Sequence, residues 1–112
     1  MKLFTGYFAR HGKHPNAVSV GGSPWWMKLP VIPELAPSAE LLADYKQGRI
    51  QWEDYVPRYI AQLDALGVSR VESLLKDGMV LLCWEKPPNH CHRHLLAEWL
   101  RKQGHYVSEL IE

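Results

Sequence analysis

The feature that most constrains the fold is an unbroken run of apolar residues from Met79 to Trp84. A strand with one wet face alternates apolar and polar residues, and this run does not alternate. Such a run is typical of a strand that is buried on both faces of a parallel sheet. We therefore predict an interior strand here, with Leu81 and Leu82 buried on opposite faces.

A helix and another strand follow this run. Apolar residues at helical spacing predict a helix over residues 90–103, and Gly104 ends it. Residues 106–111 alternate in part and predict the last strand. Strand, helix and strand in this order form a right-handed βαβ unit, so both strands are expected to be parallel in one sheet.

Two more strands are expected near the N-terminus, from Leu3 to Phe8 and from Ala17 to Val20. The segment between them, residues 9–16, is short for a parallel crossover, which normally needs a dozen or more residues. An antiparallel first strand is therefore an alternative. The next segment, up to residue 37, contains four prolines and many apolar residues, which indicates an ordered loop packed on the core.

The middle of the chain predicts helices. Ser38 is a suitable N-cap for the first of them, and Gly48 ends it. A second helix is expected to begin near Asp54, which places Pro57 in its first turn, where proline is tolerated. A capping-box pattern that begins at Ser69 predicts a short third helix.

Length and composition agree with this arrangement. The chain has 112 residues, of which 46% are hydrophobic and 22% charged, the balance of an ordinary globular domain. No apolar run approaches the roughly 20 residues of a membrane span, and the N-terminus lacks the pattern of a signal peptide. We expect residues 1–112 to form a single α/β domain, with a small, mainly parallel sheet of about four strands flanked by helices.

The two cysteines, Cys83 and Cys91, bear on the compartment. In a chain of this kind they are expected to remain thiols in a reducing cytoplasm, because a framework of disulfides belongs to small secreted domains. We therefore expect the protein to reside in the cytoplasm and Cys83 to lie in the apolar core.

Charge is distributed unevenly along the chain. The formal net charge is only +1, which argues against a protein that coats duplex DNA. Residues 1–33 nevertheless contain four Lys or Arg residues and no carboxylate. A basic segment on a nearly neutral protein suits a small anion better than a polyanion, although chance scatter over a short window explains it equally well.

Ligands of open α/β sheets bind beyond the carboxyl ends of the strands, and that rule selects three segments, residues 8–10, 21–26 and 85–93. In the first, Arg10 is a candidate ligand for an anion. In the second, the candidates are Gly21, where the backbone allows close approach, Ser23, and Trp25, which could stack on a base or sugar ring. Packing of the long loop is the simpler role for Trp25.

The third segment is the richest. If Asn89 caps the helix, the free N–H groups of the first turn form an anion site, which Arg93 would extend with a bidentate fork and His92 would border. The same field would lower the pKa of the Cys91 thiol, and Glu85 at the strand end could act as acid or base. The simpler roles are packing for Cys91, a solvated surface position for Arg93 and an ion pair for Glu85.

Metal and cofactor sites are not expected. Two cysteines and three histidines fall within residues 83–94, but no C-x-x-C pair is present. On a helix, His92 and His94 lie on opposite faces, so one metal can hardly bind both. The fingerprints of nucleoside-triphosphate, dinucleotide, α/β-hydrolase and thermolysin-type zinc sites are absent as well.

Residues 81–87 (Leu-Leu-Cys-Trp-Glu-Lys-Pro) and 91–100 (Cys-His-Arg-His-Leu-Leu-Ala-Glu-Trp-Leu) resemble the C-terminal signature of the family called domain of unknown function 488, DUF488. The likeness to its short members extends over nearly the whole chain and implies a single α/β domain with a mainly parallel sheet. Longer members carry an Arg and a Pro after the second strand. Residues 21–24 (Gly-Gly-Ser-Pro) keep the Pro and lack that Arg.

The leading hypothesis is a small anionic ligand, phosphorylated or nucleotide-like, bound at the junction from Glu85 to Arg93. Both a binding protein and an enzyme fit this pattern. Catalysis would use Cys91 as a thiolate nucleophile or Glu85 as general acid or base. The alternative is a non-enzymatic module for single-stranded nucleic acid or a protein partner, suggested by aromatic residues in the basic N-terminal third and weakened by the near-neutral charge.

Overall fold

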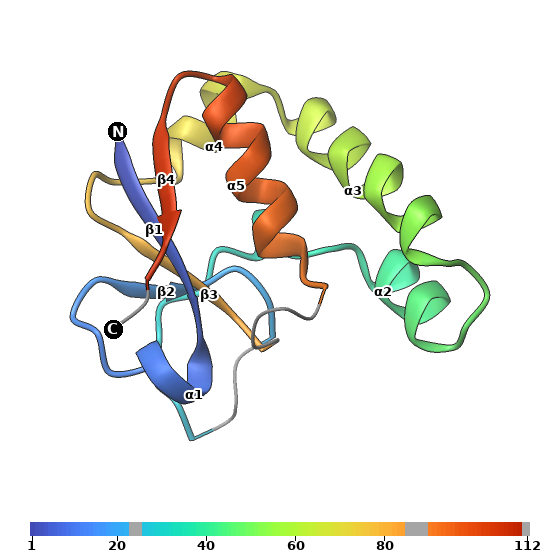
Figure 1. The fold of residues 1–112 in the computed structure, drawn as a ribbon, viewed down its shortest axis with the longest axis horizontal. Coiled ribbons are helices and arrows are strands. Elements are labelled where there is room, and N and C mark those ends of the chain that lie inside the picture. Colours follow the sequence, from blue (N-terminus) through green and yellow to red (C-terminus); the bar gives the residue numbers. More distant parts are fainter. Residues whose placement is uncertain (23–25, 85–89, 111–112) are drawn as a thin grey trace.

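The computed structural model describes residues 1–22, 26–84 and 90–110. Four parallel strands form one sheet, in the order β2-β3-β1-β4 (Figure 1). The strands are β1 (Lys2–Tyr7), β2 (Ala17–Ser19), β3 (Val80–Cys83) and β4 (Tyr106–Glu109). The expectation of an α/β fold with a small parallel sheet of four strands is confirmed.

The alternative of an antiparallel first strand is wrong. β1 pairs in parallel with β3 on one side and with β4 on the other, and a short helix, α1 (Phe8–His11), leads from β1 towards β2. The link can be short because the strands are short. β3, against which β2 pairs, is four residues long, so the chain has to travel back by only about 10 Å.

The central strand β3 confirms the prediction made from its apolar run. All four of its residues are buried, and Leu81 and Leu82 are each 0% exposed. Leu81 belongs to the larger hydrophobic cluster, whereas Leu82 packs with Phe8 and Ala17 in a second cluster. The two side chains therefore pack on opposite faces of the sheet, as alternation along a strand requires.

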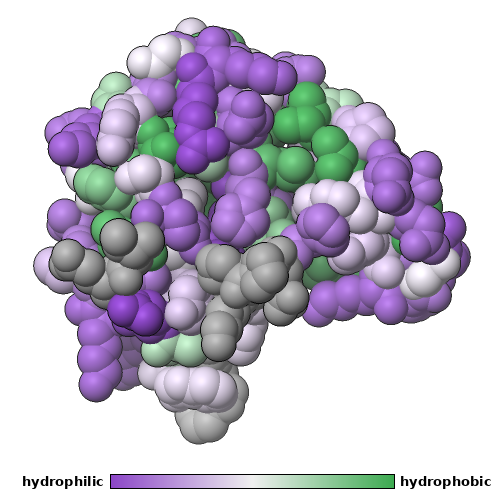
Figure 2. Space-filling model, viewed as in Figure 1, coloured by the Kyte–Doolittle hydropathy of each residue, from purple (hydrophilic) through white to green (hydrophobic). Residues whose placement is uncertain are grey.

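Helices cover the face of the sheet to which Leu81 belongs. They are α2 (Ala39–Lys46), α3 (Trp52–Leu66), α4 (Val68–Ser73) and α5 (His92–Lys102), preceded by the 3-10 turn η1 (Pro33–Leu35). Figure 1 shows α5 lying between the strands and α3. In the same view, Figure 2 shows hydrophilic side chains over most of the surface and hydrophobic ones in the region between α5 and α3.

In the middle of the chain, helix starts agree with the sequence at one place and differ at two. The Ser38 hydroxyl accepts a hydrogen bond from Leu41 N–H (3.2 Å), so the predicted cap of α2 is confirmed. Helix α3 begins at Trp52 instead of near Asp54, because Gln51 N–H donates to the Asp54 carboxylate (3.1 Å) and closes a capping box there. Pro57 consequently lies beyond the first turn.

The start of α4 also differs from the prediction. The helix begins at Val68, one residue before the Ser69 that was expected to cap it, and no side chain caps it. Its N-cap is Gly67, whose φ of 88° lies in the region that favours glycine. This glycine also ends α3, so the chain turns at one residue from one helix into the next. None of the helices in the described part of the chain has the length and apolarity to cross a membrane.

Candidate functional site

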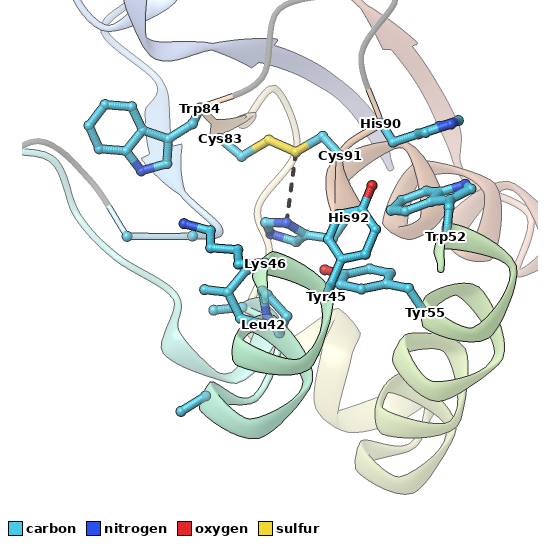
Figure 3. A pocket seen from close by; sticks show the side chains of 15 residues that line it. Leu42, Tyr45, Lys46, Trp52, Tyr55, Cys83, Trp84, His90, Cys91 and His92 are labelled. Atoms are coloured by element: carbon cyan, nitrogen blue, oxygen red, sulfur yellow. Dashed lines mark hydrogen bonds between the residues drawn. A yellow bond between two sulfur atoms is a disulfide. The ribbon is translucent and has the colours of Figure 1, made fainter. Parts of the chain in front are cut away.

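A pocket of about 740 Å³ lies where β2 and β3 end and α5 begins. The described residues that line it come from these three elements and from α2 and α3, with the segments next to them (Figure 3). They are Gly21, Gly22, Ala36, Pro37, Ala39, Leu42, Tyr45, Lys46, Trp52, Tyr55, Cys83, Trp84, His90, Cys91 and His92. The pocket thus lies at the carboxyl ends of parallel strands, the usual place for a ligand in such a sheet.

Stacked aromatic rings form one wall of the pocket. The Trp52 ring lies parallel to the His90 ring, with centroids 4.5 Å apart and an interplanar angle of 12°, and also stacks on Tyr55 at 4.9 Å. Tyr45 adds a tilted ring 5.1 Å from Tyr55. Burial raises the pKa of the Tyr55 hydroxyl above its ordinary value, so Tyr55 is uncharged at neutral pH.

The charge of the described lining is positive. Lys46, at the end of α2, is its only Lys or Arg, and it contains no Asp or Glu. Within the described residues Lys46 has no ion-pair partner. The first turn of α5 adds backbone N–H groups and the positive end of the helix dipole.

Cys83 and Cys91 are joined in a disulfide at the base of the pocket. The expectation that both remain thiols is therefore wrong, and so is the placement of Cys91 inside the first turn of a helix capped by Asn89. Cys91 is itself the N-cap, with the extended backbone of φ −148° and ψ 144°, and the helix begins at His92. The pairing depends on the sheet, which brings the end of β3 next to the start of α5.

His92 turns towards Cys91. Its Nε2–H donates to the Val20 carbonyl, which leaves the lone pair of Nδ1 facing Cys91 Sγ at 3.8 Å. Burial lowers the pKa of His92 to about 4, an effect that the hydrogen bond to Val20 offsets in part and the Arg93 charge reinforces. The imidazole is therefore neutral at pH 7 and has a defined tautomer, with Nδ1 as an acceptor.

Arg93 points away from the pocket and is 0% exposed. Its Nε and one terminal nitrogen donate to the two oxygens of the Glu109 carboxylate, at 3.1 and 2.7 Å, and its other terminal nitrogen donates to Cys83 Sγ at 3.1 Å. The Thr5 hydroxyl donates to the same carboxylate at 2.6 Å. Partial burial works to raise the pKa of Glu109, but the hydrogen bonds from Arg93 and Thr5 outweigh it and lower that pKa below its ordinary value.

The remaining predicted site residues are placed as follows. Gly21 lines the pocket, and a side chain there would crowd the ring of His92, since a Cβ would lie 3.2 Å from Cε1. Arg10 lies in α1, exposed, and does not line the pocket. The predictions for Ser23, Trp25, Glu85 and Asn89 fall outside the described residues.

The sequence analysis missed the aromatic wall and Lys46. The predicted site residues include none from α2 or α3, the helices that carry Tyr45, Lys46 and Trp52. The signal that could have found them is their position on either side of the turn between α2 and α3. No local pattern shows that this turn lies beside the end of β3.

A metal-binding set is also present. The sulfurs of Cys83 and Cys91 and one ring nitrogen of His92 lie within 4.8 Å of one another. Thiolates and imidazole are the ligands that zinc prefers, so these three residues could hold such an ion once the disulfide is reduced. The spacing of these residues in the sequence predicts no metal site, because only the fold brings Cys83 close to Cys91 and His92.

Comparison with known families gives one match. The family model DUF488-N3a, described as the active DUF488-N3 subclade, matches residues 15–104. The matched region contains β2, β3, all the helices from α2 to α5 and every described residue that lines the pocket. No curated protein and no solved structure matches the chain.

Proposed function

The chain belongs to the DUF488 family, in the subclade described as active DUF488-N3, and we propose that it binds a small ligand that combines a planar ring with a negatively charged group. A nucleoside monophosphate has this chemistry. The observation that carries the proposal is the lining of the pocket, which has an aromatic wall on one side and Lys46 with the start of α5 on the other.

The size of the pocket supports a small molecule. Ligand pockets commonly have volumes of about 300–1,000 Å³ and are mostly apolar with a few polar groups. At about 740 Å³ this pocket lies within that range. Gly21 and Gly22 leave the end of β2 without side chains beside it, so a ligand can approach the backbone closely there.

The aromatic wall supports the ring. Tyr45 and Trp52 are partly exposed and His90 is exposed, and all three line the pocket. Stacking of a base on an aromatic side chain contributes about 1–3 kcal/mol and accepts any base, because every base has a flat π face. The wall therefore favours a flat ring without selecting its identity.

The charges support the anionic group. Lys46 has no described carboxylate to neutralise it, and a phosphate near the N-terminus of α5 would gain from the helix dipole. Arg93, which the sequence analysis placed in this role, binds Glu109 in the structure. Lys46 takes its place in our proposal.

Calorimetric titration with adenosine monophosphate, adenosine and inorganic phosphate tests the proposal. We expect the monophosphate to bind more tightly than either fragment, and Lys46→Gln to weaken its binding by about tenfold, which corresponds to about 1.4 kcal/mol. Lys76→Gln is the matched control, because Lys76 is an exposed lysine just before β3, at the opposite end of that strand. An equal loss in the control, or no binding of any probe, would contradict the proposal. Retention on an oligonucleotide column at moderate salt would instead favour the nucleic-acid alternative.

A further inference from the structure

We propose that Cys83–Cys91 is a redox-active disulfide that exchanges with small thiols through the pocket. In this exchange Cys91 is the sulfur that is attacked, and Cys83 is the sulfur that leaves. The proposal goes beyond ligand binding and does not depend on which ligand, if any, the aromatic wall holds. It rests on the different surroundings of the two sulfurs.

Cys83 has the surroundings of a leaving group. Its Sγ accepts a hydrogen bond from the Arg93 guanidinium at 3.1 Å, and the side chain is 1% exposed. A guanidinium that donates to sulfur favours the thiolate over the thiol. The Glu109 carboxylate holds the guanidinium in this orientation through two further hydrogen bonds, so the donor is already positioned before the disulfide opens.

Cys91 has the surroundings of the attacked sulfur. It is the more exposed of the two, at 6%, and it caps the N-terminus of α5 beside the pocket. The lone pair of His92 Nδ1 lies 3.8 Å from its sulfur, ready to accept a hydrogen bond from the thiol that reduction produces. A purely structural disulfide would have no use for the His92 acceptor, since a cystine has no proton to donate.

The exchange takes place in two steps. A small thiolate attacks Cys91 Sγ, a new S–S bond forms to Cys91, the Cys83–Cys91 bond breaks, and its electron pair passes to Cys83, which becomes a thiolate facing Arg93. A second small thiolate then attacks the sulfur of the first and releases both as a disulfide. Cys91 leaves as a thiolate, takes one proton from water and donates it in a hydrogen bond to His92. The protein gains two electrons and two small thiols are oxidised.

Glutathione is a suitable probe, and Cys83→Ser and Cys91→Ser are a matched pair of variants. We expect reduced glutathione to open the disulfide of the unmodified protein and expose both thiols, without a lasting mixed disulfide, because a second glutathione attacks the outer sulfur and releases Cys91. With oxidised glutathione, Cys83→Ser is expected to gain the mass of one glutathione on Cys91. Cys91→Ser is expected to gain none, because Cys83 is the less accessible sulfur. Intact-protein mass spectrometry measures all three.

A measurement on the unmodified protein covers the case in which a variant does not fold. After reduction, brief treatment with iodoacetamide and peptide mapping should show Cys91 labelled before Cys83, because Cys91 is the more exposed of the two sulfurs and Cys83 is almost fully buried. Equal labelling of the two cysteines in the folded protein would overturn the proposal. So would a disulfide that excess glutathione leaves intact, which would make it a structural bond.

The metal content of the purified protein distinguishes a redox-active disulfide from a metal site at the same residues. Protein purified without chelators is expected to contain no stoichiometric zinc and to retain the Cys83–Cys91 bond. One equivalent of zinc, with both cysteines protected from alkylation until a chelator removes the metal, would overturn the redox assignment. The same three residues, Cys83, Cys91 and His92, would then form a metal site.

Discussion

His92 and Arg93 are neighbours in the sequence, yet their side chains lie in two different environments at the same edge of the sheet. His92 lines the pocket, with its ring next to a disulfide and an aromatic wall. Arg93 lies on the other side of α5's first turn, where it is fully buried and forms an ion pair with the partly buried Glu109, to which Thr5 also donates. One step along a helix rotates the side chain by about 100°, and here that rotation separates an accessible region from a closed one.

The comparison shows how one short motif can combine stability and chemistry. The ion pair around Arg93 holds α5 against β1 and β4, and it extends one N–H group to Cys83. Because this ion pair holds α5 in place, the pocket residues do not have to. The pocket can therefore contain partly exposed aromatic rings and a lysine, Lys46, that no described carboxylate pairs with. We call these the ion-pair region (Thr5, Arg93, Glu109) and the pocket region (Lys46, His92 and the aromatic wall).

The largest effect is expected from Arg93→Ala. Arg93 is fully buried while Glu109 is 24% exposed, so the loss of folding stability is expected near the lower end of the about 3–5 kcal/mol that is typical when one partner of a buried ion pair is removed. Urea unfolding measures this loss. Arg70→Ala is the matched control, because Arg70 forms an exposed pair with Glu34, and such pairs contribute about 0–1 kcal/mol. If both variants lost the same small amount of unfolding free energy, the ion-pair region would contribute no more to stability than an exposed ion pair.

The next effect is the pH dependence that His92 brings to the pocket region. Its folded pKa of about 4 lies below the ordinary value of 6.5, so the unfolded chain binds the proton more readily between these values. Stability is therefore complete above about pH 6.5 and falls as the pH drops towards 4, by up to about 3 kcal/mol in total. Urea unfolding at several pH values measures the slope.

His92→Gln should remove most of this slope, and His94→Gln serves as its control. The pKa of His94 is also lowered by burial, but His94 is less buried, so its variant should keep most of the slope. The ion-pair region behaves differently, because the pKa of Glu109 is lowered from 4.5. Its contribution is present above that value and is lost only as the pH falls through the lower folded pKa. Identical pH profiles for His92→Gln and the unmodified protein would contradict this assignment.

Thr5→Val is expected to have a smaller effect. The Thr5 side chain is buried, and its hydroxyl donates to the Glu109 carboxylate at 2.6 Å. Loss of a hydrogen bond to a charged group costs about 1.5–3 kcal/mol, while valine keeps the shape. Thermal unfolding of the variant should show this loss, together with a pKa of Glu109 closer to its ordinary value by NMR titration. An unchanged pKa would mean that Arg93 alone holds the carboxylate.

Lys46→Gln is expected to have the smallest effect on folding. Lys46 is exposed and has no described ion-pair partner, so its replacement should change the free energy of unfolding by no more than about 0.5 kcal/mol. The same variant weakens ligand binding under our proposal. A large loss of stability would show that the pocket region is part of the structural framework after all.

Local patterns in the sequence predicted the parts of the fold that depend on local physics. The apolar run at residues 79–84 predicted β3 because a strand buried on both faces cannot alternate, and Ser38 predicted the start of α2 because its hydroxyl caps an N–H group three residues away. The signature residues pointed to the junction between β3 and α5, where the pocket lies. Each of these inferences needs only neighbours along the chain.

The tertiary structure alone decided the rest. β1 lies between β3 and β4, Cys83 meets Cys91, Arg93 meets Glu109, and Trp52 meets His90, although none of these pairs shares a local pattern. These contacts depend on strand order, on register and on the rotation of each helix about its axis. A slip of one residue in register, or a rotation of about 100°, exchanges the partners while the apolar pattern of each segment stays the same. Local periodicity thus determines which segments are buried, and only their packing determines which side chains meet.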